Sequence, residues 1–203
     1  MAPQSQQVDG RRARGQQRQE LLLATVLELV RQRGLAELTI RNLATAAGVS
    51  LASITYHFPT RPELVLATCV EAMRQDLAMA RRAVQELRTA TDLRTIPIDQ
   101  LAEWLLRLSS GQEGPAMPLL SFYLEIARQP ALAAVATQWM DEIREVIADV
   151  LAELGADEPA SGAVLLHSTL AGLRLPLLAR PDLDVVQTHS AGLARLLHWI
   201  IGR

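Results

Sequence analysis

Apolar residues recur at helical spacing along most of this 203-residue chain, and the polar breaks between them are short. From residue 16 to residue 33 the apolar stripe includes Leu22, Val26 and Leu29, and it ends before Gly34. Residues spaced three and four apart share one face of an α-helix, so a first helix is predicted here. A second long amphipathic helix is predicted from Pro62 to about Leu87, because proline is tolerated in the first helical turn.

Proline and glycine breaks divide the rest of the chain into further helices. These are predicted at residues 98–108, 117–128, 131–154, 160–179 and 182–201. The segment 160–179 is apolar on nearly every side, which indicates a helix buried on more than one face. The pattern therefore predicts an all-α fold, and no apolar run reaches the roughly 18 uncharged residues that a transmembrane helix needs.

The stretch from 39 to 58 predicts two short helices joined by a tight turn. Thr39 and Ser50 are hydroxyl residues of the kind that cap helix N-termini. Gly48 lies between them and can end a helix in the left-handed conformation. Ala44 is small enough for the two helices to cross closely. A helix-turn-helix needs two helices that cross closely, and its second helix must also stay free to enter the major groove of DNA.

Composition and charge support this picture. The chain is 49% hydrophobic but only 3% aromatic, which favours helices over strands. The net charge is −2, yet residues 1–60 carry seven arginines against four carboxylates, so the head has a charge of +3 and the remainder −5. A basic head on an acidic body is expected of a DNA-binding protein with a separate second domain.

Two other features bear on setting and chemistry. Residues 1–15 are polar and without periodicity, so a disordered basic arm is predicted, either a solvated tail or a contact to DNA. The single cysteine, Cys69, excludes an internal disulfide; we expect a buried, inert thiol and a cytoplasmic setting. Neither a phosphate-binding loop nor metal-ligand spacing is present in the sequence, so neither an enzyme nor a cofactor or metal site is expected.

The stretch from 39 to 64 resembles the tetracycline-repressor (TetR) family of bacterial transcriptional regulators. The matching positions are Thr39, Arg41, Leu43, Ala44, Ala47, Gly48, Val49, Ser50, Ile54, His57, Phe58, Arg61 and Leu64. The resemblance implies a three-helix DNA-binding domain at residues 16–60, with residues 51–57 as the recognition helix. It implies a ligand-binding and dimerisation domain of about six helices at residues 61–203.

The resemblance also implies a set of DNA contacts. These are Thr39, Arg41, Ser50, Leu51, Ala52, Ser53, Thr55, Tyr56, His57 and Arg61. The family often has a tyrosine where this chain has Thr55, so either Thr55 or the following Tyr56 is expected to reach a phosphate. His57 has a second interpretation as a packing residue beside Phe58.

Candidate ligand contacts come from the body of the chain. They are Trp104, Met117, Phe122, Tyr123, Trp139, His167 and Arg174. His167 and Arg174 lie two turns apart on one apolar helix, where they can meet an anionic ligand or pair with acidic groups across a dimer seam. Core packing is the alternative for each aromatic residue.

Together these features predict a regulator that binds double-stranded operator DNA. We expect a repressor, a homodimer through its last two helices, released from a palindromic operator by a small-molecule effector and not associated with a membrane. An activator or a ligand-independent regulator is one alternative. The other is a helical small-molecule-binding or enzymatic protein in which the helix-turn-helix only packs.

Overall fold

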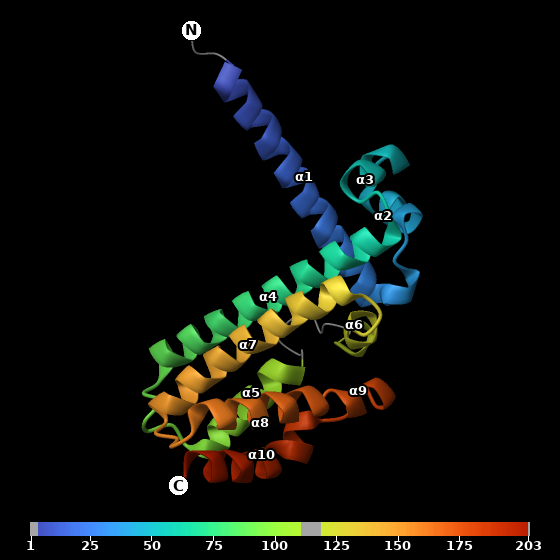
Figure 1. Ribbon diagram of the computed structural model, residues 1–203. Helices are drawn as coiled ribbons and strands as arrows, with labels where there is room; N and C mark the ends of the chain where they lie inside the picture. Colours follow the sequence, from blue (N-terminus) through green and yellow to red (C-terminus); the bar gives the residue numbers. More distant parts are fainter. Residues whose placement is uncertain (1–3, 111–118, 203) are drawn as a thin grey trace. The chain divides into compact units, whose positions relative to one another are not determined.

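The computed structural model describes residues 4–110 and 119–202, and every regular element within those residues is helical. The chain forms two compact units (Figure 1). One, called here the helix-turn-helix unit, contains residues up to 72 together with 121–132. The other, called the helical body, contains residues 73–120 and 133–203. The first unit extends past residue 60, where the sequence predicts the end of the DNA-binding domain. The extent of the DNA-binding domain itself stays a prediction.

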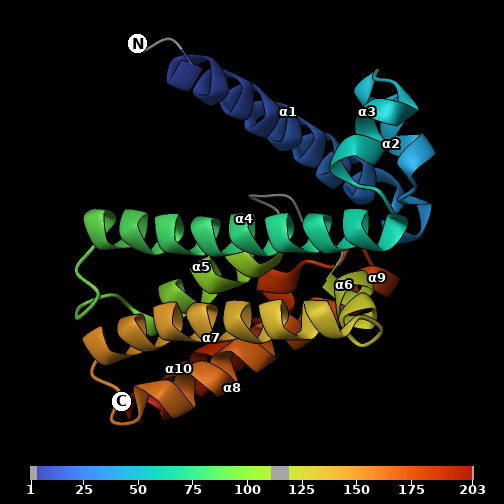
Figure 2. The ribbon, with the colours of Figure 1, turned by 45° about the horizontal axis from the view of Figure 1, so that its top comes forward.

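The helix-turn-helix unit begins with α1 (Gln4–Arg33), followed by the short 3-10 helix η1 (Leu35–Glu37), α2 (Ile40–Ala47) and α3 (Leu51–His57). Helices α2 and α3 pack on each other, and α2 packs against α1 (Figure 2). The core between them is formed by fully buried apolar side chains, among them Leu22, Val26, Leu43 and Ile54. The predicted three-helix arrangement is confirmed.

One prediction in this unit is wrong. Residues 4–15, expected to be a disordered arm, continue α1 upstream of the predicted start at residue 16. The segment is rich in glutamine and arginine, which have high helix propensity and need no apolar stripe to extend an existing helix. Periodicity locates only the part of a helix that packs, so it did not detect this extension.

Helix α4 (Arg61–Ala90) is continuous, with residues 61–72 in the helix-turn-helix unit and residues 73–90 in the body. Helix α6 (Leu119–Ile126) and helix α7 (Pro130–Glu153) come after α5 (Ile98–Ser110) along the chain. Within the body, Arg81 on α4 pairs with Glu142 on α7 at 3.1 Å, and Arg88 pairs with Glu153. These exposed ion pairs join the two helices at two places, about two turns apart on α4 and about three turns apart on α7.

The core of the body lies between α5, α7, α8 (Pro159–Gly172) and α10 (Val185–Ile201). Helices α5 and α10 pack along each other, with Leu101 and Leu197 fully buried. At Gly162, α8 approaches α10 so closely that an added Cβ would lie 2.6 Å from Ile200 Cγ2. Within the described residues, no helix is both long and apolar enough to cross a membrane.

The single helix predicted at 160–179 is divided in the structure. Helix α8 ends at Gly172, and a short helix α9 covers Leu175–Ala179. Pro176 has no N–H group, so the Gly172 carbonyl loses its partner four residues on, and the chain turns at Leu173 and Arg174. The helix predicted from 182 starts later, at Val185, where Asp184 caps it by accepting a hydrogen bond from the Gln187 N–H at 2.9 Å.

Candidate nucleic-acid interface and a polar cluster in the helical body

Local hydrogen bonds fix the geometry of the helix-turn-helix. Thr39 Oγ1 accepts from the Asn42 N–H at 3.0 Å and caps α2, while Ser50 Oγ accepts from the Ser53 N–H at 3.2 Å and caps α3. Gly48 ends α2 at φ 62°, where a side chain would be strained. Both caps and the glycine stop confirm the sequence prediction. Each capping hydroxyl keeps its own proton, which it can donate to a phosphate.

Helix α3 has a buried side and an open side. Ile54 and the following Phe58 are buried in the unit's core. On the open side, Leu51 is 50% exposed and Tyr56 is 83% exposed, and Ala52 is exposed as well. The apolar residues of this face can contact a thymine methyl group but cannot form hydrogen bonds with bases.

The structure distinguishes the hydroxyl groups of Thr55 and Tyr56, between which the sequence did not decide. Thr55 Oγ1 donates back to its own helix, lying 3.2 Å from both the Leu51 and Ala52 carbonyls. Tyr56 projects from the surface instead, with its ring in edge contact with His57 at 5.1 Å between centroids. The geometry therefore favours Tyr56 as the residue that reaches a phosphate. His57 also lies beside the Phe58 ring at 6.3 Å.

Arg61 makes contacts within the protein that its place in the motif did not reveal. Its Nε donates to the Leu38 carbonyl at 3.0 Å, and its Nη2 donates to the Leu35 carbonyl at 3.4 Å. These carbonyls belong to η1 and to the linker that leads into the Thr39 cap. A guanidinium has five N–H donors, so three remain for a phosphate. Arg61 thus joins the start of α4 to the segment that enters α2.

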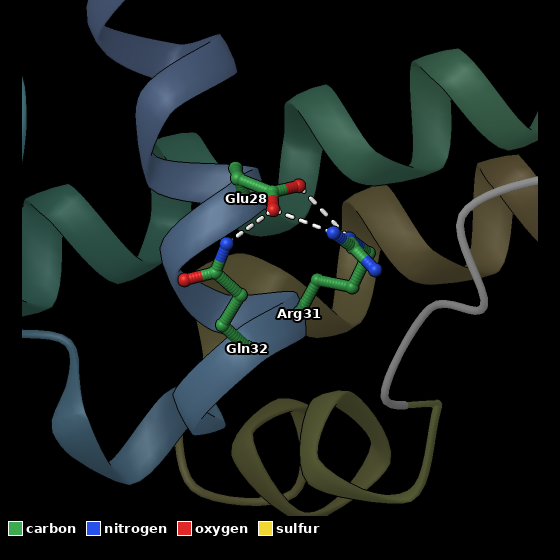
Figure 3. Close-up of polar contacts among 3 residues, drawn as sticks. All are labelled: Glu28, Arg31 and Gln32. Atoms are coloured by element: carbon green, nitrogen blue, oxygen red, sulfur yellow. Dashed lines mark hydrogen bonds and ion pairs between the residues drawn. The ribbon is translucent and has the colours of Figure 1, made fainter.

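Not every arginine of the basic head is free to meet DNA. Figure 3 shows Glu28 on α1 accepting hydrogen bonds from Arg31 Nε at 2.8 Å and from Gln32 Nε2 at 2.5 Å. The hydrogen bonds from Arg31 and Gln32 lower the pKa of Glu28. All of this lies at the surface, where such a pair adds little stability. Arg41, by contrast, is exposed on α2 and is the better candidate for a DNA contact.

The predicted ligand residues do not form one group. Trp104 packs against the hydrophobic core of the body, which is the core-packing alternative. Phe122 is buried in the helix-turn-helix unit, and Tyr123 belongs to the same unit. Met117 lies outside the described residues. Trp139, His167 and Arg174 all belong to the body, where they lie together.

The structure adds two residues to this last set, Asp76 on α4 and Arg144 on α7. We call these two with Trp139, His167 and Arg174 the polar cluster. The Trp139 and His167 rings meet edge to face at 6.1 Å between centroids. Arg174 Nε donates to the Ser109 carbonyl at the end of α5, at 2.7 Å. Residues from α4, α7, α8 and the turn before α9 therefore converge in the body.

The electrostatics of the polar cluster favour uncharged forms of its titratable groups. Burial raises the pKa of Asp76, and the Arg174 charge and the Trp139 indole partly offset that shift. Burial lowers the pKa of His167, and the positive charges of Arg144 and Arg174 lower it further. With His167 neutral, the positive charges of the polar cluster are the two guanidinium groups, and Arg174 is the one that acts on Asp76.

A signal for Asp76 was present in the sequence. It stands between Met73 and Leu77 on the apolar stripe of the long helix, where a carboxylate is out of place. Arg144 gave no such signal, since it looks like one more charged residue on a mixed helix. Cys69 is fully buried, as predicted, and burial raises its thiol pKa to about 12.

Comparison with known families matches two long segments of the chain. Residues 22–68 match the family "Bacterial regulatory proteins, tetR family", and residues 94–203 match "Tetracyclin repressor-like, C-terminal domain". The first match contains the capped α2–turn–α3 segment, and the second contains most of the body.

Individual proteins give the same result. The HTH-type transcriptional regulator CymR of Pseudomonas putida is 27% identical over 175 residues, covering 83% of each chain. The multidrug binding protein EbrR, solved with proflavin, is 26% identical, with a TM-score of 0.63 over 87% of this chain and 98% of EbrR. A transcriptional regulator of Saccharomonospora viridis, solved with choline, shares the fold with a TM-score of 0.70 at 24% identity, over 90% of this chain and 96% of that one.

Proposed function

The chain belongs to the TetR family of bacterial DNA-binding transcriptional regulators, and from that premise we propose that it is a repressor released from a palindromic operator by a small molecule. The observation that carries the proposal is the combination of two features in one chain. The helix-turn-helix unit presents a capped recognition helix with an open face. Continuous α4 connects that unit to a body with a buried polar cluster.

The proposed DNA interface divides by chemistry. Tyr56, Arg61 and the capping hydroxyls of Thr39 and Ser50 contact phosphates, which set the position of the protein on the duplex. Sequence is read by Arg41 together with the first turn of α3, residues 51–53. Few of these side chains can form hydrogen bonds with bases, so half-site spacing and DNA shape supply much of the specificity.

A second copy of the chain is proposed to cover the outward faces of α8 and α10. Val164 and Leu165 on α8 are 47% and 38% exposed, and Trp199 on α10 is 73% exposed. Covering roughly 150 Å² of the indole would contribute about 4 kcal/mol per protomer. A two-fold dimer also explains how two recognition helices reach successive major grooves, about 34–36 Å apart.

The effector is proposed to act through the polar cluster. Asp76 lies on α4, the helix that begins at Arg61, so a ligand that moves α4 changes the placement of a DNA-contacting residue. To release the operator, the ligand must bind the DNA-incompetent state more tightly. A 100-fold preference corresponds to about 2.7 kcal/mol. The similar multidrug binding protein EbrR, solved with proflavin, supports a ligand site in such a body. The proposed activity is binding, without catalysis, in the cytoplasm where the DNA lies.

A gel shift with the DNA upstream of the protein's own gene tests the proposal. We expect salt-sensitive, sequence-specific binding, because phosphate contacts release counterions. Arg41→Ala should reduce specific binding. Equal affinity for the upstream fragment and for a shuffled fragment would refute a specific operator. A promoter reporter then separates repression from activation, since deleting the protein raises expression only if it represses.

Light scattering tests the proposed dimer. Trp199→Glu places a charge at the centre of the proposed interface and should yield a monomer at micromolar concentration. Leu124→Glu is the matched control, because Leu124 is 54% exposed but belongs to the other unit, and this variant should stay dimeric. A dimeric Trp199→Glu protein would place the interface elsewhere.

A further inference from the structure

The polar cluster contains two buried hydrogen-bond donors without an acceptor in the described part of the chain. They are Trp139 Nε1 and Arg144 Nε. The Trp139 indole faces Asp76 closely enough to lower its pKa, yet its N–H makes no hydrogen bond of ordinary geometry. Arg144 approaches Asp141 only through Nη1, at 3.4 Å, which leaves Nε unused.

Orphaned donors inside a protein are costly. Leaving a buried polar group without a partner costs about 1–3 kcal/mol, and few such groups persist in native proteins without a reason. An indole N–H and a guanidinium N–H can only donate. Among the described residues, the buried side-chain atoms left without a hydrogen-bond partner are these two donors, and no acceptor is among them. The missing partner is therefore an acceptor.

The charge of the cluster points the same way. Arg144 and Arg174 both act on His167, whose lowered pKa keeps the imidazole neutral. Asp76 is the single carboxyl group of the cluster, and Arg174 already faces it. A cationic ligand would add a third positive charge beside two guanidinium groups and would leave both donors orphaned. An anion would be attracted and would satisfy them.

We propose that the polar cluster binds the carboxylate of a small organic acid, with its oxygens accepting hydrogen bonds from Trp139 Nε1 and Arg144 Nε. A carboxylate fits because its two oxygens can each accept from one donor. The inference rests on the proposed function in one respect: the acid is the effector of the regulator. Binding of the acid itself can be measured without DNA.

NMR of the full-length protein, labelled with nitrogen-15, provides the direct test. The Trp139 indole signal, assigned from Trp139→Phe, should move downfield when acetate is added, because acetate accepts a hydrogen bond from the indole N–H. Acetate is chosen as the probe because it is small enough to reach the donors, whatever the rest of the natural ligand looks like. Trp104 and Trp199 are internal controls whose indole signals should stay in place. Acetamide, the uncharged counterpart of acetate, should leave all three signals unchanged.

A thermal-shift series then measures affinity. Straight-chain acids from acetate to decanoate, with benzoate, are compared with their amides and with choline. We expect at least one acid to raise Tm with saturation while its amide does not. Arg144→Gln should weaken the binding of that acid about 10- to 100-fold, because a hydrogen bond between charged groups is lost. Arg107→Gln, an exposed position on α5, is the matched control and should bind as the wild type does.

The outcomes separate this inference from the proposed function. An unmoved Trp139 signal with no acid raising Tm overturns the carboxylate site, and so does tight binding of acid by Arg144→Gln. If choline, and no acid, releases operator DNA in the gel shift, the carboxylate site fails while ligand-controlled repression stands. If an acid binds with the expected variant effects but leaves the DNA complex intact, the site stands and its role as effector fails.

Discussion

Replacing Arg61 tests how the helix-turn-helix is held together as well as how it meets DNA. Arg61 donates hydrogen bonds to the Leu38 carbonyl at 3.0 Å and the Leu35 carbonyl at 3.4 Å. A hydrogen bond from a charged group contributes about 1.5–3 kcal/mol when buried. Arg61 is exposed, and the longer bond is weak, so we expect Arg61→Ala to cost about 1–2 kcal/mol in total.

The expected change in thermal stability follows from the size of the chain. At roughly 2–4 °C per kcal/mol for a protein of this length, Arg61→Ala should lower Tm by about 2–8 °C. The change in DNA binding is read from the salt dependence of affinity. Each lost phosphate contact reduces the slope of log K against log salt by about 0.9, so the proposed dimer should lose about 1.8.

Two further variants separate the two roles. Arg61→Lys keeps the positive charge but lacks the planar fork that spans two carbonyls, so it should keep the salt slope and still lower Tm. Arg41→Ala removes an exposed side chain, so it should weaken DNA binding without changing Tm. Wild-type Tm in Arg61→Ala would refute the positioning role, and a wild-type salt slope would refute the phosphate contact.

Three other predictions follow from the fold. Tyr56→Phe should weaken DNA binding several-fold while Thr55→Val leaves it unchanged, measured by gel shift; the reverse order would assign the contact to Thr55, whose hydroxyl now bonds to its own helix. Gly162→Ala should have a free energy of unfolding in urea about 1–3 kcal/mol below that of Gly172→Ala. The reason is that an added Cβ meets Ile200 at the first site and no atom within 4 Å at the second. Equal stabilities would show that α8 and α10 separate freely. Burial raises the thiol pKa of Cys69 to about 12 from 9.0. The neutral thiol therefore contributes its full share of stability below about pH 9, and this contribution is lost as the pH rises towards 12. Rapid reaction of the native protein with a thiol reagent at about pH 8 would contradict the burial of Cys69.

The sequence alone determined the features that depend on near neighbours. The caps at Thr39 and Ser50 and the glycine stop at Gly48 each involve atoms within about four residues, so residue type and spacing were enough to predict them. The helical periodicity gave the all-α fold and most helix positions for the same reason. It failed for residues 4–15, where a helix continues without any packed face.

Tertiary structure alone decided which distant residues meet. The partners of Arg61 lie 23 and 26 residues away, and Arg174 reaches a carbonyl 65 residues away. The same is true of the polar cluster, which takes Asp76 and Arg144 from helices far apart in sequence and leaves Phe122 in another unit. Burial and charge at such a site arise from packing among several helices, and no spacing along one helix encodes them.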